Sequence, residues 1–189
     1  MIKKILISSF LLLLLLYPVR TFSKIYLGLG PEYVLPLGNS GNTNKPTVGV
    51  NLQLESRQIC KFWYGFRLDY MSFKKSDNAL IGENYFTNAF KLSPEIRYNF
   101  VCSDCYKYTF IPYLQGMVTL SSIGNTDALN RLGIGGALGG GIAYSFTTFE
   151  SCWMLDLNAL YFAPNIIYRV DGRASLQSIN VGLTLSIRI

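Results

Sequence analysis

The chain has 189 residues, a formal net charge of +6 and no histidine, and half of its residues are hydrophobic. The absence of histidine excludes Ser-His-Asp hydrolysis, histidine-dependent metal sites and histidine-using enzymes that modify lipid acyl chains. The basic residues form no run and no arginine-rich helix, so nucleic-acid binding has no support.

The first 23 residues are expected to form a secretory signal peptide. Lys3 and Lys4 give a positive start, and an apolar core of twelve residues runs from Ile5 to Leu16. A membrane-spanning helix needs about 20 apolar residues, so this core is too short for an anchor. We predict cleavage after Ser23 and export by the general secretory pathway. The formal charge then falls to +3, and residues Lys24–Ile189 form one domain.

The rest of the chain reads as eight stretches in which apolar and polar residues alternate. The last stretch is the clearest, with Val181 and Leu183 on one face and Asn180 and Gly182 on the other. A period of two predicts a strand with one apolar and one polar face. In chain order the expected strands are Lys24–Leu35, Thr47–Ser56, Phe62–Phe73, Ala89–Phe100, Tyr108–Leu120, Leu132–Phe146, Trp153–Phe162 and Leu176–Ile189.

The connections between these strands alternate in length. The longer set is polar and comprises Pro36–Pro46, Lys74–Asn88, Ser121–Arg131 and Ala163–Ser175. The shorter set comprises Arg57–Lys61, Val101–Lys107 and Thr147–Cys152. Short periplasmic turns and longer outer loops are typical of an outer-membrane barrel, and an even strand number places both termini in the periplasm.

These patterns predict an all-β fold, an eight-stranded antiparallel up-and-down transmembrane β-barrel. The alternative is a soluble lipocalin-like barrel, whose apolar face points inward and whose polar face meets water. The polar faces here are dominated by Gly, Ser, Asn, Gln and Thr rather than by Lys and Glu. Aromatic residues also gather near the strand ends, where an interfacial girdle is expected: Tyr33, Trp63, Tyr64, Tyr98, Phe100, Tyr108, Phe146, Trp153, Tyr161 and Phe162.

The terminal strand carries the most specific motif. Asn180, Gly182, Leu185 and Ile187 fit the pattern polar-x-Gly-x-x-hydrophobic-x-hydrophobic. In this motif, and in the pattern of its eight alternating stretches, the chain resembles the eight-stranded outer membrane protein β-barrels. That group contains the transmembrane domain of outer membrane protein A and small adhesin-like barrels. The resemblance implies a protein of the outer membrane of a Gram-negative bacterium, with membrane lipid and the barrel-insertion machinery as partners.

Charged residues occur on the polar faces near mid-strand. An eight-stranded barrel leaves a lumen that side chains fill, so these charges are expected to be buried there and paired. Arg67, Asp69, Glu95 and Arg97 are expected to pair across the third and fourth strands. A catalytic pair of Asp69 and Glu95 is the functional alternative, and we favour the structural interpretation. The complete set is Glu55, Arg67, Asp69, Lys91, Glu95, Arg97, Asp156 and Arg188.

Pro94 and Pro112 fall inside expected strands. Each proline removes one hydrogen bond from the ladder, so bulges or local bends are expected at these two positions.

The glycine-rich segment Leu132–Gly141 has some likeness to a nucleotide-binding loop. It lacks the GKS/T ending, and no convincing helix follows it. Alternation resumes after it, so a glycine-rich strand is the better interpretation. Gly139 and Gly141 would then leave room in the lumen for long Arg or Tyr side chains from other strands.

The four cysteines, Cys60, Cys102, Cys105 and Cys152, all fall at or beside the three short turns. An even number of cysteines in an exported chain favours disulfides. Free thiols and a redox or metal site at Cys102 and Cys105 are the alternatives. Because neighbouring turns lie close, we expect two bridges that fan outward from the central turn. Cys60–Cys102 with Cys105–Cys152 is preferred over the swapped pairing, because it keeps the bridges from crossing.

No arrangement of residues in the sequence indicates catalysis or a cofactor. We expect a non-enzymatic protein that acts structurally, or as an adhesin through its outer loops. The alternatives are a narrow pore for small solutes and a secreted carrier of an apolar ligand.

Overall fold

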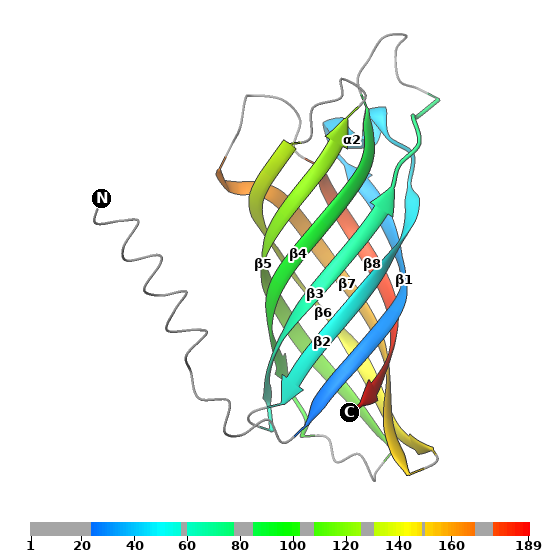
Figure 1. Cartoon of the computed structure of the whole chain (residues 1–189), viewed down its shortest axis with the longest axis vertical. Helices are drawn as coiled ribbons and strands as arrows, with labels where there is room; N and C mark the ends of the chain where they lie inside the picture. The colour runs from blue at the N-terminus through cyan, green and yellow to red at the C-terminus, as the bar shows by residue number, and fades with distance from the viewer. Residues whose placement is uncertain are drawn as a thin grey trace, which may run out of the picture.

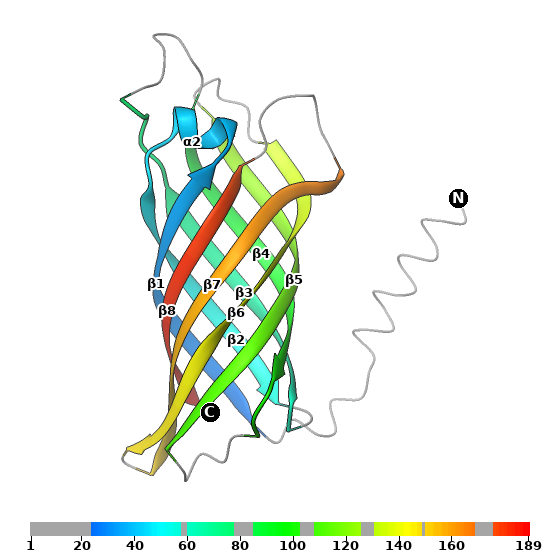
Figure 2. The same cartoon turned by 180° about the vertical axis from the view of Figure 1, so that it is seen from behind.

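Eight antiparallel strands close into a barrel in chain order, β1 to β8, with β8 hydrogen-bonded to β1 (Figures 1 and 2). The computed structural model describes residues 24–57, 60–77, 85–102, 108–125, 131–148, 150–168 and 176–189, so the predicted signal peptide lies outside the described residues. The strands are β1 (Ile25–Leu37), β2 (Thr47–Arg57), β3 (Phe62–Ser72), β4 (Phe86–Asn99), β5 (Thr109–Asn125), β6 (Arg131–Thr148), β7 (Ser151–Tyr168) and β8 (Gln177–Arg188). The predicted fold class is confirmed.

The alternation in the sequence determines which side chains face the lumen. On β8, Val181 and Leu183 are exposed on the outside, whereas Asn180 and Thr184 are buried inside. The same division holds on the other strands, and outward apolar side chains such as Leu138 are up to 70% exposed. This arrangement is the reverse of a lipocalin, in which the apolar face lines the interior. The soluble-carrier alternative is therefore wrong.

The barrel has two different ends. The end with the connections β1–β2, β3–β4, β5–β6 and β7–β8 is called the long-connection end, and the other the short-turn end, where β8 finishes (Figure 1). The expected difference in length fails for the β4–β5 connection, which spans residues 100–108. It is longer than the β5–β6 and β7–β8 connections, residues 126–130 and 169–176, and as long as the β1–β2 connection, residues 38–46. Pairing of β5 with β6 continues to Ile123 and Arg131, which shortens the connection between them.

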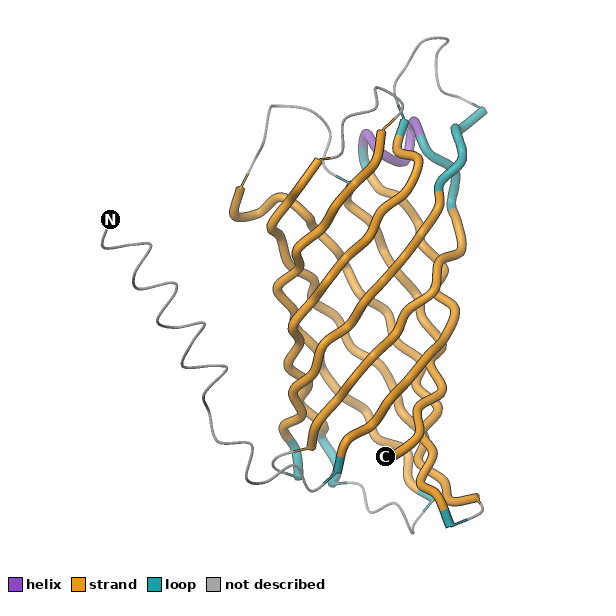
Figure 3. The backbone as a smooth tube through the Cα atoms, viewed as in Figure 1, coloured by secondary structure: helices purple, strands orange, loops and turns teal. Residues whose placement is uncertain are grey.

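A short helix, α2 (Asn39–Thr43), lies at the long-connection end, within the stretch expected to be loop (Figure 3). Gly38 precedes it with a φ of 58°, a conformation that glycine adopts without the strain of a Cβ atom. The Ser40 hydroxyl donates to the Leu37 carbonyl oxygen at 2.7 Å, which fixes the turn. Within the described residues no helix is long and apolar enough to cross a membrane.

The expected bulges at the two prolines are not found. Phe66 pairs with Pro94 and Ile142 with Pro112 in an unbroken register. The missing N–H of each proline removes one bond to one neighbour. The carbonyl of Pro112 still accepts, from the Phe100 amide at 3.0 Å. The register shifts between β4 and β5 and between β6 and β7 lie elsewhere, at residues 86–88 and 134–136.

The glycine-rich segment is part of β6, as expected. Gly139 and Gly141 face the lumen, where β7 approaches closely. A Cβ atom on Gly139 would lie 2.0 Å from the Ala159 carbonyl oxygen, and one on Gly141 would lie 2.6 Å from the Tyr113 hydroxyl. The missing side chains therefore make room for the neighbouring strand and for Tyr113.

Candidate functional site: a charged lumen and two different rims

Seven of the eight charged residues that were predicted to lie in the lumen are buried there. Arg188 is only half-buried and lies opposite Tyr26 near the short-turn end. The other seven residues are at most 5% exposed: Glu55, Arg67, Asp69, Lys91, Glu95, Arg97 and Asp156.

One cluster of charges surrounds Arg97 on β4. Its Nη1 lies 2.8 Å from Asp156 Oδ2 on β7 and 3.3 Å from Glu55 Oε2 on β2. Its guanidinium carbon lies 3.6 Å from the ring centre of Tyr113 and 5.1 Å from that of Trp63. The Tyr113 hydroxyl donates to Asp156 Oδ1 at 2.5 Å. Arg97 thus joins β4 to two strands that do not neighbour it, β2 and β7, and lies against two aromatic rings.

A second cluster lies toward the long-connection end. Arg67 Nε donates to Asp69 Oδ1 at 2.7 Å, and its Nη2 lies 3.2 Å from Glu32 Oε1 on β1. Lys91 Nζ lies 3.8 Å from the ring centre of Phe162 on β7, which it meets in a cation–π contact. Glu32 is 1% exposed, and the sequence analysis did not assign it to the lumen. The alternation predicts this position, because the next residue, Tyr33, is exposed on the outer face.

The expected pairing across β3 and β4 is wrong. The register sets Arg67 opposite Ser93 and Arg97 opposite Trp63, so neither arginine faces a carboxylate on the adjacent strand. The ion pairs instead reach along one strand, to Asp69, or to other strands of the barrel. The reason is the narrow lumen, in which a long side chain can contact the far wall.

A catalytic carboxylate pair is not formed. Asp69 lies opposite Lys91 and Glu95 lies opposite Gly65, which separates the two acids by four positions, roughly 13 Å along the strands. Glu95 accepts hydrogen bonds from the side-chain amides of two glutamines, Gln53 and Gln115. In the described part of the chain no three Cys, Asp or Glu side chains are grouped so that they could hold a metal ion.

Apolar side chains form a buried cluster inside the barrel toward each end. Two residues expected in the interfacial girdle, Trp63 and Phe162, are instead buried inside at 1% and 2% exposure, because they share the parity of the lumen-facing residues. The cluster at the short-turn end contains Tyr26, Trp63, Ile111, Tyr113, Ala143, Cys152 and Met154. The cluster at the long-connection end contains Val34, Met71, Phe73, Phe86, Ala89, Ile123 and Leu176.

The first two long connections are joined above the barrel. Buried Asn44 binds both main-chain groups of Phe86, donating to its oxygen at 2.8 Å and accepting from its nitrogen at 3.3 Å. The Lys45 amide donates to the Lys74 carbonyl oxygen at 2.9 Å, and the Lys45 ammonium lies 2.7 Å from Asp77. The joined residues Asn44, Lys45, Lys74, Asp77 and Phe86 are called the rim platform. It gives the long-connection end an ordered, charged surface.

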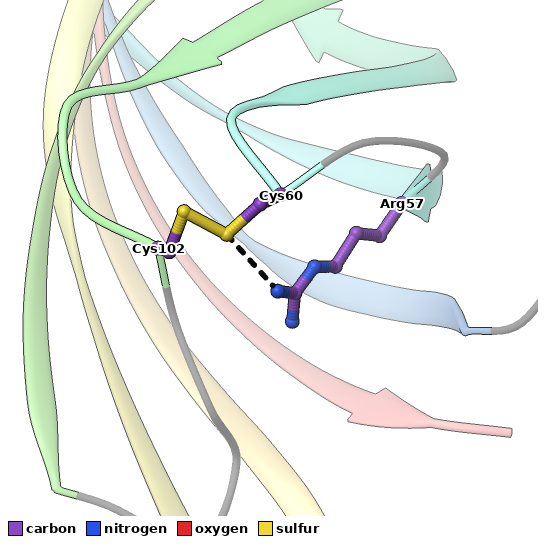
Figure 4. The surroundings of a disulfide bond; sticks show 3 residues. All are labelled: Arg57, Cys60 and Cys102. Atoms are coloured by element: carbon purple, nitrogen blue, oxygen red, sulfur yellow. Dashed lines mark hydrogen bonds between the residues drawn. A yellow bond between two sulfur atoms is a disulfide. The ribbon is translucent and has the colours of Figure 1, made fainter.

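A disulfide joins Cys60 to Cys102 at the short-turn end, with 5.2 Å between the Cα atoms (Figure 4). This is the first of the two bridges expected. Cys105 lies outside the described residues, so the bridge Cys105–Cys152 stays a prediction. Cys152 itself is buried near the start of β7, and its sulfur lies 3.6 Å from the Tyr26 hydroxyl.

The residues of the terminal-strand motif divide between the two faces of β8. Asn180 and Gly182 face the lumen, whereas Leu185 and Ile187 face outward. A Cβ atom on Gly182 would lie 2.9 Å from Asn158 Oδ1, so glycine leaves room for that side chain. The motif therefore presents its two apolar members on the outer wall.

No family model and no curated protein matches the sequence. Among solved structures, the chain is similar to Neisserial surface protein A (NspA), with 14% identity and a TM-score of 0.56 over 87% of this chain and 96% of that one. It is also similar to Ail, the attachment invasion locus protein of Yersinia pestis (13% identity, TM-score 0.45, 88% and 97% covered). A third is a major outer membrane protein from Thermus thermophilus (10%, TM-score 0.47, 88% and 98%). The likeness to NspA confirms the expected resemblance at the level of fold.

Proposed function

We propose that the chain is an integral outer-membrane β-barrel protein of a Gram-negative bacterium, without enzymatic activity, that acts structurally or as an adhesin through its long-connection end. The observation that carries this proposal is the apolar outer wall, since a wall of exposed aliphatic and aromatic side chains fits lipid rather than water. The rim platform supports the adhesive role because it holds polar and charged groups in fixed positions above that wall. The outward Leu185 and Ile187 support recognition of β8 by the barrel-insertion machinery.

The protein should fractionate with the outer membrane and require detergent for release. Cells that carry it should bind host-cell or matrix surfaces, and neutralising two charged residues of the rim platform (Lys45→Gln with Asp77→Asn) should reduce that binding. The matched control neutralises two exposed charges at the short-turn end (Lys61→Gln with Glu150→Gln) and should leave binding unchanged. Recovery in the soluble periplasmic fraction would contradict membrane residence, and equal binding by both variants would contradict a role for the rim platform.

A narrow pore is the second candidate, and the lumen argues against it. Buried apolar clusters occupy the interior toward both ends, and Arg97 bridges Glu55 and Asp156 between them. We expect no steady single-channel conductance when the purified barrel is inserted into planar bilayers. Regular conductance steps from the unaltered protein would favour the pore instead.

A further inference from the structure

The Cys60–Cys102 disulfide lies beside the guanidinium of Arg57, a contact that the sequence did not predict. Arg57, the last residue of β2, donates from Nη2 to Cys60 Sγ at 3.3 Å (Figure 4). The Arg57 main chain is fixed, because its amide donates to the Lys24 carbonyl oxygen at 3.1 Å and it pairs with Trp63 on β3. The guanidinium therefore reaches the sulfur from an ordered strand end.

The two sulfurs of this bridge have different surroundings. Cys102 is exposed, whereas Cys60 is half-buried and has the Arg57 guanidinium at its sulfur. An attacking thiolate approaches one sulfur and displaces the other, and exchange is faster when the leaving thiolate is stabilised. Access therefore favours attack at Cys102, and the guanidinium favours Cys60 as the leaving group.

We propose that the Cys60–Cys102 bond is a site of thiol–disulfide exchange, at which a partner thiolate attacks Cys102 and Cys60 leaves as a thiolate bound by Arg57. A bond forms between the partner sulfur and Cys102 Sγ, the Cys60–Cys102 bond breaks, and its electron pair remains on Cys60. The partner disulfide replaces the internal one, so no external oxidant or reductant is needed. The chemical class of the partner is an accessible thiol, as in a thiol–disulfide oxidoreductase.

The location of that partner in the periplasm rests on the proposed function, whereas the exchange chemistry does not. The bridge connects the β2–β3 turn with the segment after β4, 42 residues apart in sequence. Opening it would release these two connections from one another at the end of the barrel that carries the C-terminus (Figure 1). The exchange is therefore a reversible covalent attachment at the short-turn end.

The test treats the full-length folded barrel in detergent with reduced glutathione, stops the reaction with acid, and maps the mixed disulfide by mass spectrometry. In the unaltered chain glutathione should be found first on Cys102. Arg57→Gln should slow its attachment by about threefold to tenfold, because the leaving thiolate loses a charge-assisted hydrogen bond. Arg57→Lys, which keeps the charge, should lie between the two.

Lys61→Gln is the matched control. It removes an exposed cation next to Cys60 in sequence, whereas the hydrogen bond to the Cys60 sulfur comes from Arg57. The rate should therefore change by less than about twofold. Glutathione found first on Cys60, Cys105 or Cys152 would overturn the proposal. The proposal would also be overturned if glutathione attached to Arg57→Gln at the same rate as to the unaltered chain or to Lys61→Gln. The site of attack is read in the unaltered chain, which keeps the proposal testable if a variant fails to fold.

Discussion

Arg97→Met is expected to lower the free energy of unfolding by about 3–5 kcal/mol, the cost of removing one partner from a buried ion pair. Among the described side chains, Arg97 is the cation within 4 Å of both Glu55 and Asp156. Without this cation two carboxylates, each 1% exposed, remain buried in the lumen. Urea titration of the barrel refolded into lipid vesicles measures the loss.

The matched control neutralises the stranded acids. A triple variant, Arg97→Met with Glu55→Gln and Asp156→Asn, should recover most of the lost stability, because neutral amides cost less to bury than unpaired carboxylates. Arg97→Lys should lose less than Arg97→Met, since it keeps the charge but not the planar contact with Tyr113. A triple variant no more stable than Arg97→Met would contradict the ion-pair explanation and favour lost packing.

The faces of the strands could be predicted from the sequence because parity alone determines them. Once Arg67 is assigned to the lumen, every second residue of β3 follows, including Trp63 and Met71. The same rule places Glu32 and Phe162 inside. An aromatic residue near a strand end suggests an interfacial girdle, but for Trp63 and Phe162 the alternation is the stronger evidence.

The partners of the buried charges could not be predicted in this way. They depend on the register between strands and on which side chains meet across the lumen, and Arg97 reaches β2 and β7 rather than β3. The helix α2 gave no periodic signal either, because five residues are too few to show one. The Arg57–Cys60 contact likewise depends on where β2 ends.

Leu52→Arg is expected to destabilise the barrel by roughly 2–4 kcal/mol, the cost of placing a cation in lipid near the midplane. Leu52 is the central residue of β2, faces outward at 40% exposure, and pairs with Leu29 and Leu68 on the two neighbouring strands. An arginine there would replace an aliphatic contact with lipid by a charge that has no acidic neighbour among these paired residues. The free energy of unfolding in vesicles measures the effect.

Val48→Arg is the matched control on the same face of the same strand. Val48 lies four residues nearer the long-connection end, roughly 13 Å along the strand. Its arginine can reach the interface, so the loss should be about 0–1 kcal/mol. A quencher in the lipid phase should also reach a label at Leu52→Cys and not at Gln53→Cys, because Gln53 faces the lumen. Equal losses for the two arginines, or a quenched label at position 53, would contradict the assignment of the outer wall to lipid.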